Sequence, residues 1–204
     1  MIKIFKNSFQ VLKRIKPIIL IVFILTLISL GVGFYLSQSD SSIILSVKNN
    51  FLSEIKKAKP IQDILRAIME NNILYAIFYT AIYNTIFGAF LSTTLLGIIF
   101  PIPVIVMVER GLFVGLLYGD IQGNYLYYLL MFGTIVFEFG AYVLSSSLGI
   151  NIGLSIFWPK RFHTNSRWQA FKIAWLEAFQ ALPLIVVILF ISAIWEIGGL
   201  YLLM

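Results

Sequence analysis

The sequence predicts an all-α, polytopic helical membrane protein, and its composition and the lengths of its apolar runs are the reasons. Of its 204 residues, 60% are hydrophobic and 12% are charged, and the mean hydropathy is +0.94. A soluble domain has roughly twice that charged fraction. The apolar residues gather in runs of about 20, the length a helix needs to cross about 30 Å of hydrocarbon. Short alternating segments typical of a membrane barrel do not occur. We therefore expect one integral membrane domain, 1–204, with about five transmembrane helices and additional amphipathic interfacial helices.

The first span is expected at about residues 17–36, directly after a basic flank. A cleaved signal peptide has the same order of a basic and an apolar region. This apolar run is longer than a typical signal core, however, and residues 37–40 offer no usual cleavage site. We therefore interpret the run as a retained anchor. Residues 2–16 alternate basic and apolar positions, which suits a helix at the level of the lipid headgroups.

Residues 38–72 form the longest polar stretch of the chain and are expected to lie outside the membrane core. Near the end of this stretch, apolar residues recur at helical spacing, which predicts an amphipathic helix leading into the next span. They are Ile61, Ile64, Leu65 and Ile68. The stretch could be a solvated connector that rests on membrane or protein, or a dedicated binding segment.

The remaining spans follow from apolar runs and their breaks. Residues 73–118 are almost continuously apolar, long enough for two crossings, and Pro101 and Pro103 mark the break because proline removes a backbone donor and disfavours helix before it. A turn-like connector is expected at 119–124. Between Asn165 and Gln180, aromatic and small residues at helical spacing predict an interfacial helix. The spans after the first are thus expected at about residues 73–98, 103–118, 125–153 and 179–203.

Positive charge indicates the orientation and the partners. The N-terminal flank and residues 158–175 carry the clearest excess of Lys and Arg, and five crossings place both on one side. The positive-inside tendency makes that side cytoplasmic, so 158–175 is a cytoplasmic basic loop and 38–72 faces outward. We expect a multi-pass protein of the cell (plasma) membrane with a cytoplasmic N-terminus. Its partners are the lipid bilayer and other membrane or envelope proteins, with homo-oligomerisation left open and no nucleic acid.

Several polar residues occur inside segments that are otherwise apolar enough to span a bilayer. A charge at membrane depth costs at least about 2.5–3.5 kcal/mol on insertion scales, so it is retained when it is paired, hydrated or used. Neither Glu138 nor Glu196 has a basic residue one turn away on its own helix, and Arg110 is the candidate cation from another helix. The set is either an interhelical polar lock or a proton, ion or substrate site. Its members are Asn84, Glu109, Arg110, Glu138 and Glu196.

Glycines at four-residue spacing occur in two places and predict close helix packing. Such glycines share one helix face and let a neighbouring backbone approach. We expect packing within the chain, with homodimerisation as the alternative. The glycines are Gly111, Gly115 and Gly119 in the third span, and Gly149 and Gly153 at the end of the fourth.

The sequence lacks the residues of several kinds of catalytic site. His163 is the only histidine and cysteine is absent, so the usual zinc ligand sets cannot form. There is no phosphate-binding glycine-rich loop with its lysine and no nucleophile elbow. We expect no metal, no cofactor and no enzymatic activity.

Four stretches, in order between about residues 75 and 200, resemble the stage II sporulation protein M family. Arg110-Gly111-Leu-Phe-Val-Gly115 stands where the family has Asn-Gly-x-x-x-Gly. The stretch around Glu138 resembles the family's His-Gly-x-x-Glu-x-x-Ala, with Thr134 and Ile135 in place of His-Gly. The other two are Ile82-Tyr-Asn84 with Gly88, similar to the second span, and Ala193-Ile-Trp-Glu196, similar to the C-terminal Ala-x-x-Glu.

The resemblance implies a non-enzymatic membrane protein. In spore-forming bacteria the family member works with a wall-degrading partner and a third, membrane-anchored protein, which it localises or scaffolds. We therefore expect a scaffold or localisation component of an envelope-remodelling complex. The alternative is a small transporter or permease subunit in which Glu138 and Glu196 couple to a proton or ion, and an intramembrane enzyme ranks third.

Overall fold

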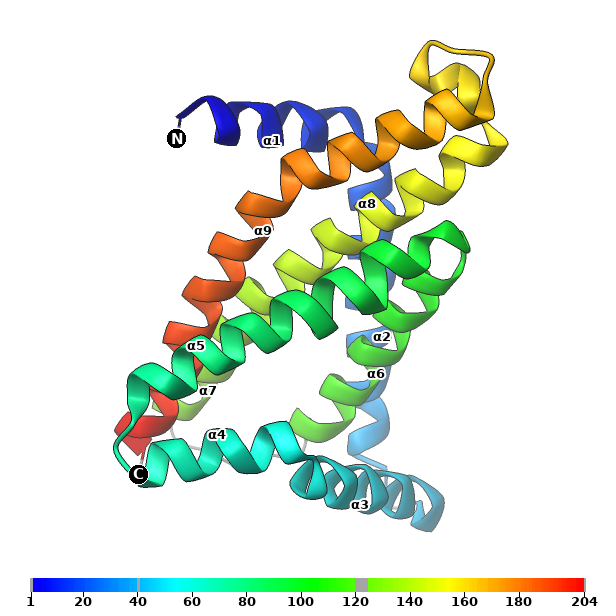
Figure 1. Ribbon diagram of the computed structural model, residues 1–204. Coiled ribbons are helices and arrows are strands. Elements are labelled where there is room, and N and C mark those ends of the chain that lie inside the picture. Colours follow the sequence, from blue (N-terminus) through cyan, green and yellow to red (C-terminus); the bar gives the residue numbers. More distant parts are fainter. Residues whose placement is uncertain (1, 40, 120–124, 204) are drawn as a thin grey trace.

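The computed structural model describes residues 2–39, 41–119 and 125–203, and every regular element in these ranges is a helix (Figure 1). The turn expected at 119–124 lies, apart from Gly119, outside the described residues. The α-helices are α1 (Ile2–Arg14), α2 (Lys16–Ser37), α3 (Ser42–Lys57), α4 (Lys59–Met69), α5 (Ile73–Tyr83), α6 (Ile102–Tyr118), α7 (Tyr125–Thr134), α8 (Gly140–Phe157) and α9 (Arg167–Leu203). The π-helical segments are η1 (Asn84–Leu95) and η3 (Ile135–Phe139), and the 3₁₀ turns are η2 (Leu96–Ile98) and η4 (Pro159–Phe162).

Within the described residues, four helical stretches are long and apolar enough to cross a membrane: Lys16–Ser37, Ile73–Ile98, Tyr128–Phe157 and Arg167–Leu202. The protein is therefore a multi-pass membrane protein, and the expected number of five spans is one too many. The expected third span is α6, which has 17 residues and carries Glu109 and Arg110. At 1.5 Å per residue it rises about 26 Å, short of a full hydrocarbon core.

The short helix α6 packs against α2 through glycine on both helices (Figure 1). A Cβ added at Gly115 would overlap the carbonyl oxygen of Leu30, and one at Gly33 would overlap that of Leu112. Gly111 and Gly119 face two serines of α2 in the same way. The glycine face predicted for this segment is thus covered by a helix of the same chain, at backbone contact distance.

The central helix α8 is buried along almost its whole length, from Ala141 to Ser155. Its neighbours are α2, α6, α9 and η1. Gly149 faces the carbonyl oxygen of Thr93, and Gly153 faces that of Gly97, so α8 and the η1–η2 segment touch through their backbones. Small residues on α8 thereby permit a close-packed core.

Hydroxyl groups join η1 to α8 at the same level. Ser145 Oγ donates to the carbonyl of Ala89 at 3.0 Å, and Thr93 Oγ1 donates to Ser145 Oγ at 2.9 Å. The hydroxyls of Thr94 and Ser145 lie 2.7 Å apart. All three side chains are buried, and their polar atoms satisfy one another.

The last helix, α9, is one continuous helix of 37 residues, with Pro183 inside it. It includes both the interfacial helix expected at Asn165–Gln180 and the last span. Residues 158–175 are therefore not a loop throughout, since the helix begins at Arg167. Figure 1 shows that α9 changes direction along its length, as proline in a helix causes.

The N-terminal helix α1 is fastened to α9 by polar contacts. Ser8 Oγ donates to the carbonyl of Gln180 at 2.6 Å. Arg14 forms an ion pair with Glu177, whose carboxylate also accepts from Asn151 Nδ2 at 3.2 Å. Arg14 in addition lies over the ring of Phe162, 4.8 Å from its centroid. We call Arg14, Asn151 and Glu177 the α1–α9 cluster.

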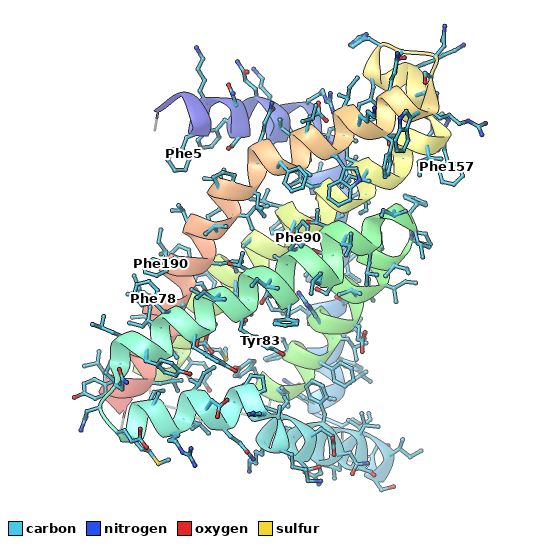
Figure 2. All side chains as sticks on the ribbon, viewed as in Figure 1. Phe5, Phe78, Tyr83, Phe90, Phe157 and Phe190 are labelled. Carbon is cyan, nitrogen blue, oxygen red and sulfur yellow. The ribbon has the colours of Figure 1, made fainter. Side chains whose placement is uncertain are left out.

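The outer surface of the bundle is apolar, as contact with lipid requires. Large side chains such as Phe23 on α2, Phe78 on α5 and Phe157 on α8 are about half exposed or more. Figure 2 shows Phe157 pointing away from the bundle. Exposed apolar residues of this size on several helices are unusual for a water-soluble monomer and suit a hydrocarbon environment.

Candidate functional site

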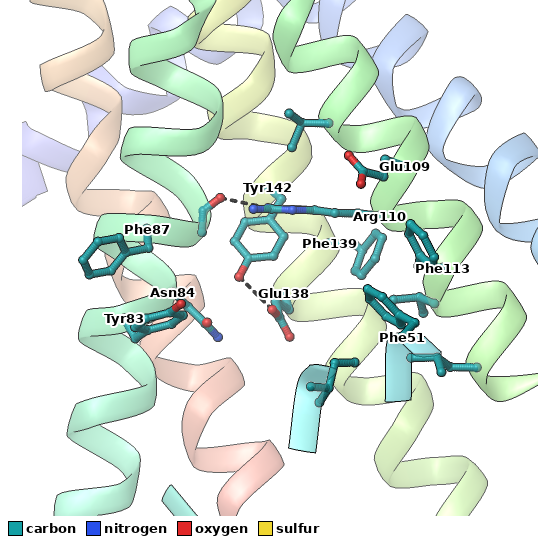
Figure 3. Close-up of a pocket in the computed structure, with 15 residues that line it drawn as sticks. Phe51, Tyr83, Asn84, Phe87, Glu109, Arg110, Phe113, Glu138, Phe139 and Tyr142 are labelled. Carbon is teal, nitrogen blue, oxygen red and sulfur yellow. Dashed lines mark hydrogen bonds between the residues drawn. The ribbon is translucent and has the colours of Figure 1, made fainter. Parts of the chain in front are cut away.

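A cavity of about 600 Å³ opens between α3, the α5–η1 helix, α6 and the η3–α8 helix (Figure 3). Four of the five polar residues that the sequence singled out line it: Asn84, Glu109, Arg110 and Glu138. The fifth, Glu196, is not in the cavity wall and lies half-buried on α9. The remaining lining residues are Phe51, Ile55, Tyr83, Phe87, Gly88, Val106, Phe113, Val114, Leu117, Phe139 and Tyr142.

Both π-helical segments of the described chain contribute to this cavity. The segment η1 supplies Asn84, Phe87 and Gly88, and η3 supplies Glu138 and Phe139. A π-helical turn has one more residue than an α-turn and re-aims the side chains around it, and such turns are frequent at functional sites. The spacing of apolar residues gave no sign of either segment.

Arg110 reaches from α6 to η1, and its hydrogen bonds within the described residues go to uncharged groups. Its Nη1 donates to the carbonyl of Gly88 and its Nη2 donates to Ser92 Oγ, both at 2.8 Å. Its guanidinium carbon lies 4.3 Å from the centroid of the Tyr142 ring, a cation–π distance. Within the described residues, no ion pair joins Arg110 to a carboxylate.

Glu138 faces the same cavity with one hydrogen bond to the protein. Its Oε1 accepts from the hydroxyl of Tyr142, one turn later on the same helix, at 2.7 Å. Tyr142 is thus placed between the two charges, with its ring under Arg110 and its hydroxyl on Glu138 (Figure 3). The carboxylates of Glu138 and Glu196 are near enough to influence each other electrostatically.

The other predicted polar residues take different positions. Glu109 is exposed at the cavity wall, while Asn84 is half-buried and its side chain has no hydrogen-bond partner in the part of the chain that the structure describes. The interpretation as a polar lock and the interpretation as a site both stay predictions. The Arg110–Tyr142–Glu138 contacts resemble a lock, and the adjoining cavity has room for a ligand.

Sequence reasoning missed Tyr142, Ser92 and Phe51. Tyr142 could have been found, because it lies four residues after Glu138 and shares its helix face. Phe51 comes from the polar segment 38–72, and its ring stacks on that of Phe113 with centroids 4.1 Å apart. That contact brings α3 to the cavity, and its partner on α6 cannot be read from spacing along the chain.

A second charged cluster also escaped notice, the α1–α9 cluster. Glu177 is largely buried, with a side-chain exposure of 13%. Nearby, burial lowers the pKa of Arg161, and the positive charge of Arg14 lowers it further, whereas Glu177 opposes this shift. No group of three His, Cys, Asp or Glu in the described ranges could hold a metal ion.

These features define a class of protein, a multi-pass helical membrane protein with a charged cavity between its helices. The family model for Stage II sporulation protein M matches residues 19–197, most of the chain. The chain therefore belongs to the SpoIIM family, and the resemblance found in its motifs is confirmed. Comparison with curated proteins and with solved structures gives no match.

Proposed function

We propose that the protein is a non-enzymatic scaffold or localisation component of an envelope-remodelling complex in the cell membrane. The observation that carries the proposal is the close-packed core around α8. Directly after the cavity residue Gly88, and one turn after the cavity residue Tyr142, the side chains of Ala89 and Ser145 are fully buried. A core held by backbone contacts and mutual hydroxyl bonds is rigid, and a rigid membrane body suits a protein that holds others in place.

The α3–α4 pair is the proposed contact surface for envelope partners. The helix α3 buries none of its residues, and both helices lie across one end of the bundle (Figure 1). The opposite end holds α1 and η4 with their basic residues. The positive-inside tendency supports a cytoplasmic location for that basic end and hence an outward α3–α4 pair.

Purification from native membranes in mild detergent, followed by mass spectrometry of stoichiometric partners, tests this proposal. We expect envelope-remodelling or wall-hydrolase proteins with the wild-type chain. Reversing the exposed charges by Lys56→Glu and Lys59→Glu should remove them, and the matched change Lys172→Glu at the other end should not. Recovery of no stoichiometric partner would contradict the proposal.

The second candidate is transport of a proton or ion, and the cavity with Glu138 in its wall is the observation that favours it. Glutamates inside membrane helices often mark proton or ion paths. Reconstitution in liposomes tests this function: a pH-dependent flux that Glu138→Gln abolishes would support it. An intact, reconstituted protein without flux would exclude it.

A further inference from the structure

We infer that the cavity between α3, η1, α6 and α8 binds an organic cation, an onium group on an apolar body, with Glu138 as its counter-ion. This inference goes beyond the proposed scaffold function, because binding requires neither a protein partner nor flux. It rests on the charges of the cavity, its walls and its size.

Within the described residues, the Glu138 carboxylate in the cavity forms no ion pair, although the charge of Arg110 acts on it from the same wall. Both terminal nitrogens of Arg110 donate to neutral oxygens, on Gly88 and Ser92, and its face lies on Tyr142. Glu138 receives a single hydrogen bond, from Tyr142, through one of its two oxygens. Figure 3 shows the Glu138 carboxylate turned into the open space. A carboxylate at membrane depth requires compensation by charge, hydrogen bonds or water.

Further negative charge lies close to this carboxylate. The second acidic side chain of the cavity wall is Glu109. Against Glu109 and Glu138 the wall offers one guanidinium, Arg110. The electrostatic potential of the site therefore favours a positive ligand.

The walls select an organic cation over a metal ion. Six aromatic rings surround the space, and the faces of such rings attract onium groups. Ca²⁺ and Mg²⁺ require about six oxygen ligands, but the described residues contain no group of three His, Cys, Asp or Glu side chains placed to hold a metal ion. A volume of about 600 Å³ is in the range of small-molecule sites. The rings belong to Phe51, Tyr83, Phe87, Phe113, Phe139 and Tyr142.

Equilibrium binding of tetraphenylphosphonium to the purified full-length chain in mild detergent tests the inference. Tetraphenylborate is the matched probe, with the same shape and the opposite charge. We expect saturable binding of the cation that Glu138→Gln weakens at least about ten-fold, as loss of a desolvated counter-ion implies. Glu54→Gln on the exposed face of α3 should leave the affinity unchanged, since the Glu54 side chain is exposed, pairs with Lys57 at 3.4 Å and does not line the cavity.

Two further variants separate a direct role of Glu138 from a structural one. Tyr142→Phe keeps the ring under Arg110 and removes the hydrogen bond to Glu138, so cation binding should persist within about three-fold, equivalent to under 1 kcal/mol. Phe87→Leu removes an exposed ring from the wall and should weaken binding without unfolding. Equal binding of tetraphenylborate, no saturable binding, or loss of binding in Tyr142→Phe would each overturn the inference.

Discussion

The two ends of the helix bundle hold their charges in opposite ways. At the end near α1, Arg14 is paired with Glu177, and Asn151 completes the contact. At the cavity, Arg110 and Glu138 share Tyr142 but form no ion pair. The first arrangement joins helices through opposite charges. The second holds a cation and a carboxylate apart beside open space, so the same residue types serve as a fastening in one place and as a candidate site in the other.

Helix packing also differs between the two regions. Around Gly149 the backbones of α8 and η1 are in contact, whereas Gly140, at the other end of α8, has no atom within 4 Å of an added Cβ. We therefore expect substitutions at the packed end to act on stability and those at the cavity to act on binding.

Gly149→Ala should have the largest effect. Its Cβ would overlap the carbonyl of Thr93, and since backbone cannot yield as a side chain does, we expect a loss of about 3 kcal/mol in the free energy of unfolding. Denaturant titration in mild detergent measures it. Gly140→Ala is the matched control and should be neutral or stabilising by about 0.5–1 kcal/mol, because alanine favours helix. Equal losses in both variants would remove the contrast in packing.

Arg14→Ala should have the second-largest effect, a loss of about 1.5–3 kcal/mol in the free energy of unfolding. The reason is that it leaves the carboxylate of Glu177 without its charged donor. The same titration measures it, and Arg14→Lys should recover part of the loss. Lys13→Ala, at an exposed neighbouring position, should change stability by about 0.5 kcal/mol or less. A neutral Arg14→Ala would mean that the α1–α9 cluster does not stabilise the fold.

Ser145→Ala should lower the free energy of unfolding by about 0.6–1.7 kcal/mol, the range measured for interhelical hydrogen bonds in a membrane protein. It removes the oxygen that joins Thr93, Thr94 and Ala89. The neighbouring Ser146 is equally buried but its hydroxyl has no partner in the described structure, so Ser146→Ala should not destabilise. Thermal unfolding of the two variants side by side measures the difference, and the reverse order would contradict the hydroxyl cluster.

Glu138→Gln should have the smallest effect on stability, about 0.5 kcal/mol or less. The amide oxygen still accepts from Tyr142, and the rest of the side chain faces the cavity. Its free energy of unfolding is compared directly with that of Arg14→Ala. If Glu138→Gln lowered the free energy of unfolding as much as Arg14→Ala, the cavity charges would be a stabilising polar lock like the α1–α9 cluster. The proposed difference between the two regions would then be wrong.

Apolar length was sufficient to predict the first two long helices. The expected spans at 17–36 and 73–98 correspond to stretches Lys16–Ser37 and Ile73–Ile98. The same reasoning predicted one span too many, at α6. The expected span was bounded by the prolines before it and the glycine after it, and the helix between them has only 17 residues and carries two adjacent charges.

The sequence was sufficient to predict several residues of the candidate site, but not which of them are in contact. Charge inside an apolar run is visible in sequence, and it identified Arg110 and Glu138. Which helices meet depends on packing, so neither Tyr142 between them nor Phe51 on α3 followed from spacing. Glu177 was missed for a related reason: it lies among basic and aromatic residues typical of a membrane surface, and its burial comes from α1, more than 150 residues earlier in the chain.

The fastening of α1 to α9 also has a consequence for the order of assembly. Arg14 and Glu177 are 163 positions apart, and a ribosome that adds about 5–20 residues per second needs roughly 8–33 s to make the chain between them. Throughout that interval the ion pair that joins α1 to α9 cannot form, because Glu177 has not yet been made. Closure of this end of the molecule is therefore a late event of biogenesis. A chain halted before residue 177 would lack the ion pair by which Arg14 holds α1 against α9 in the finished chain.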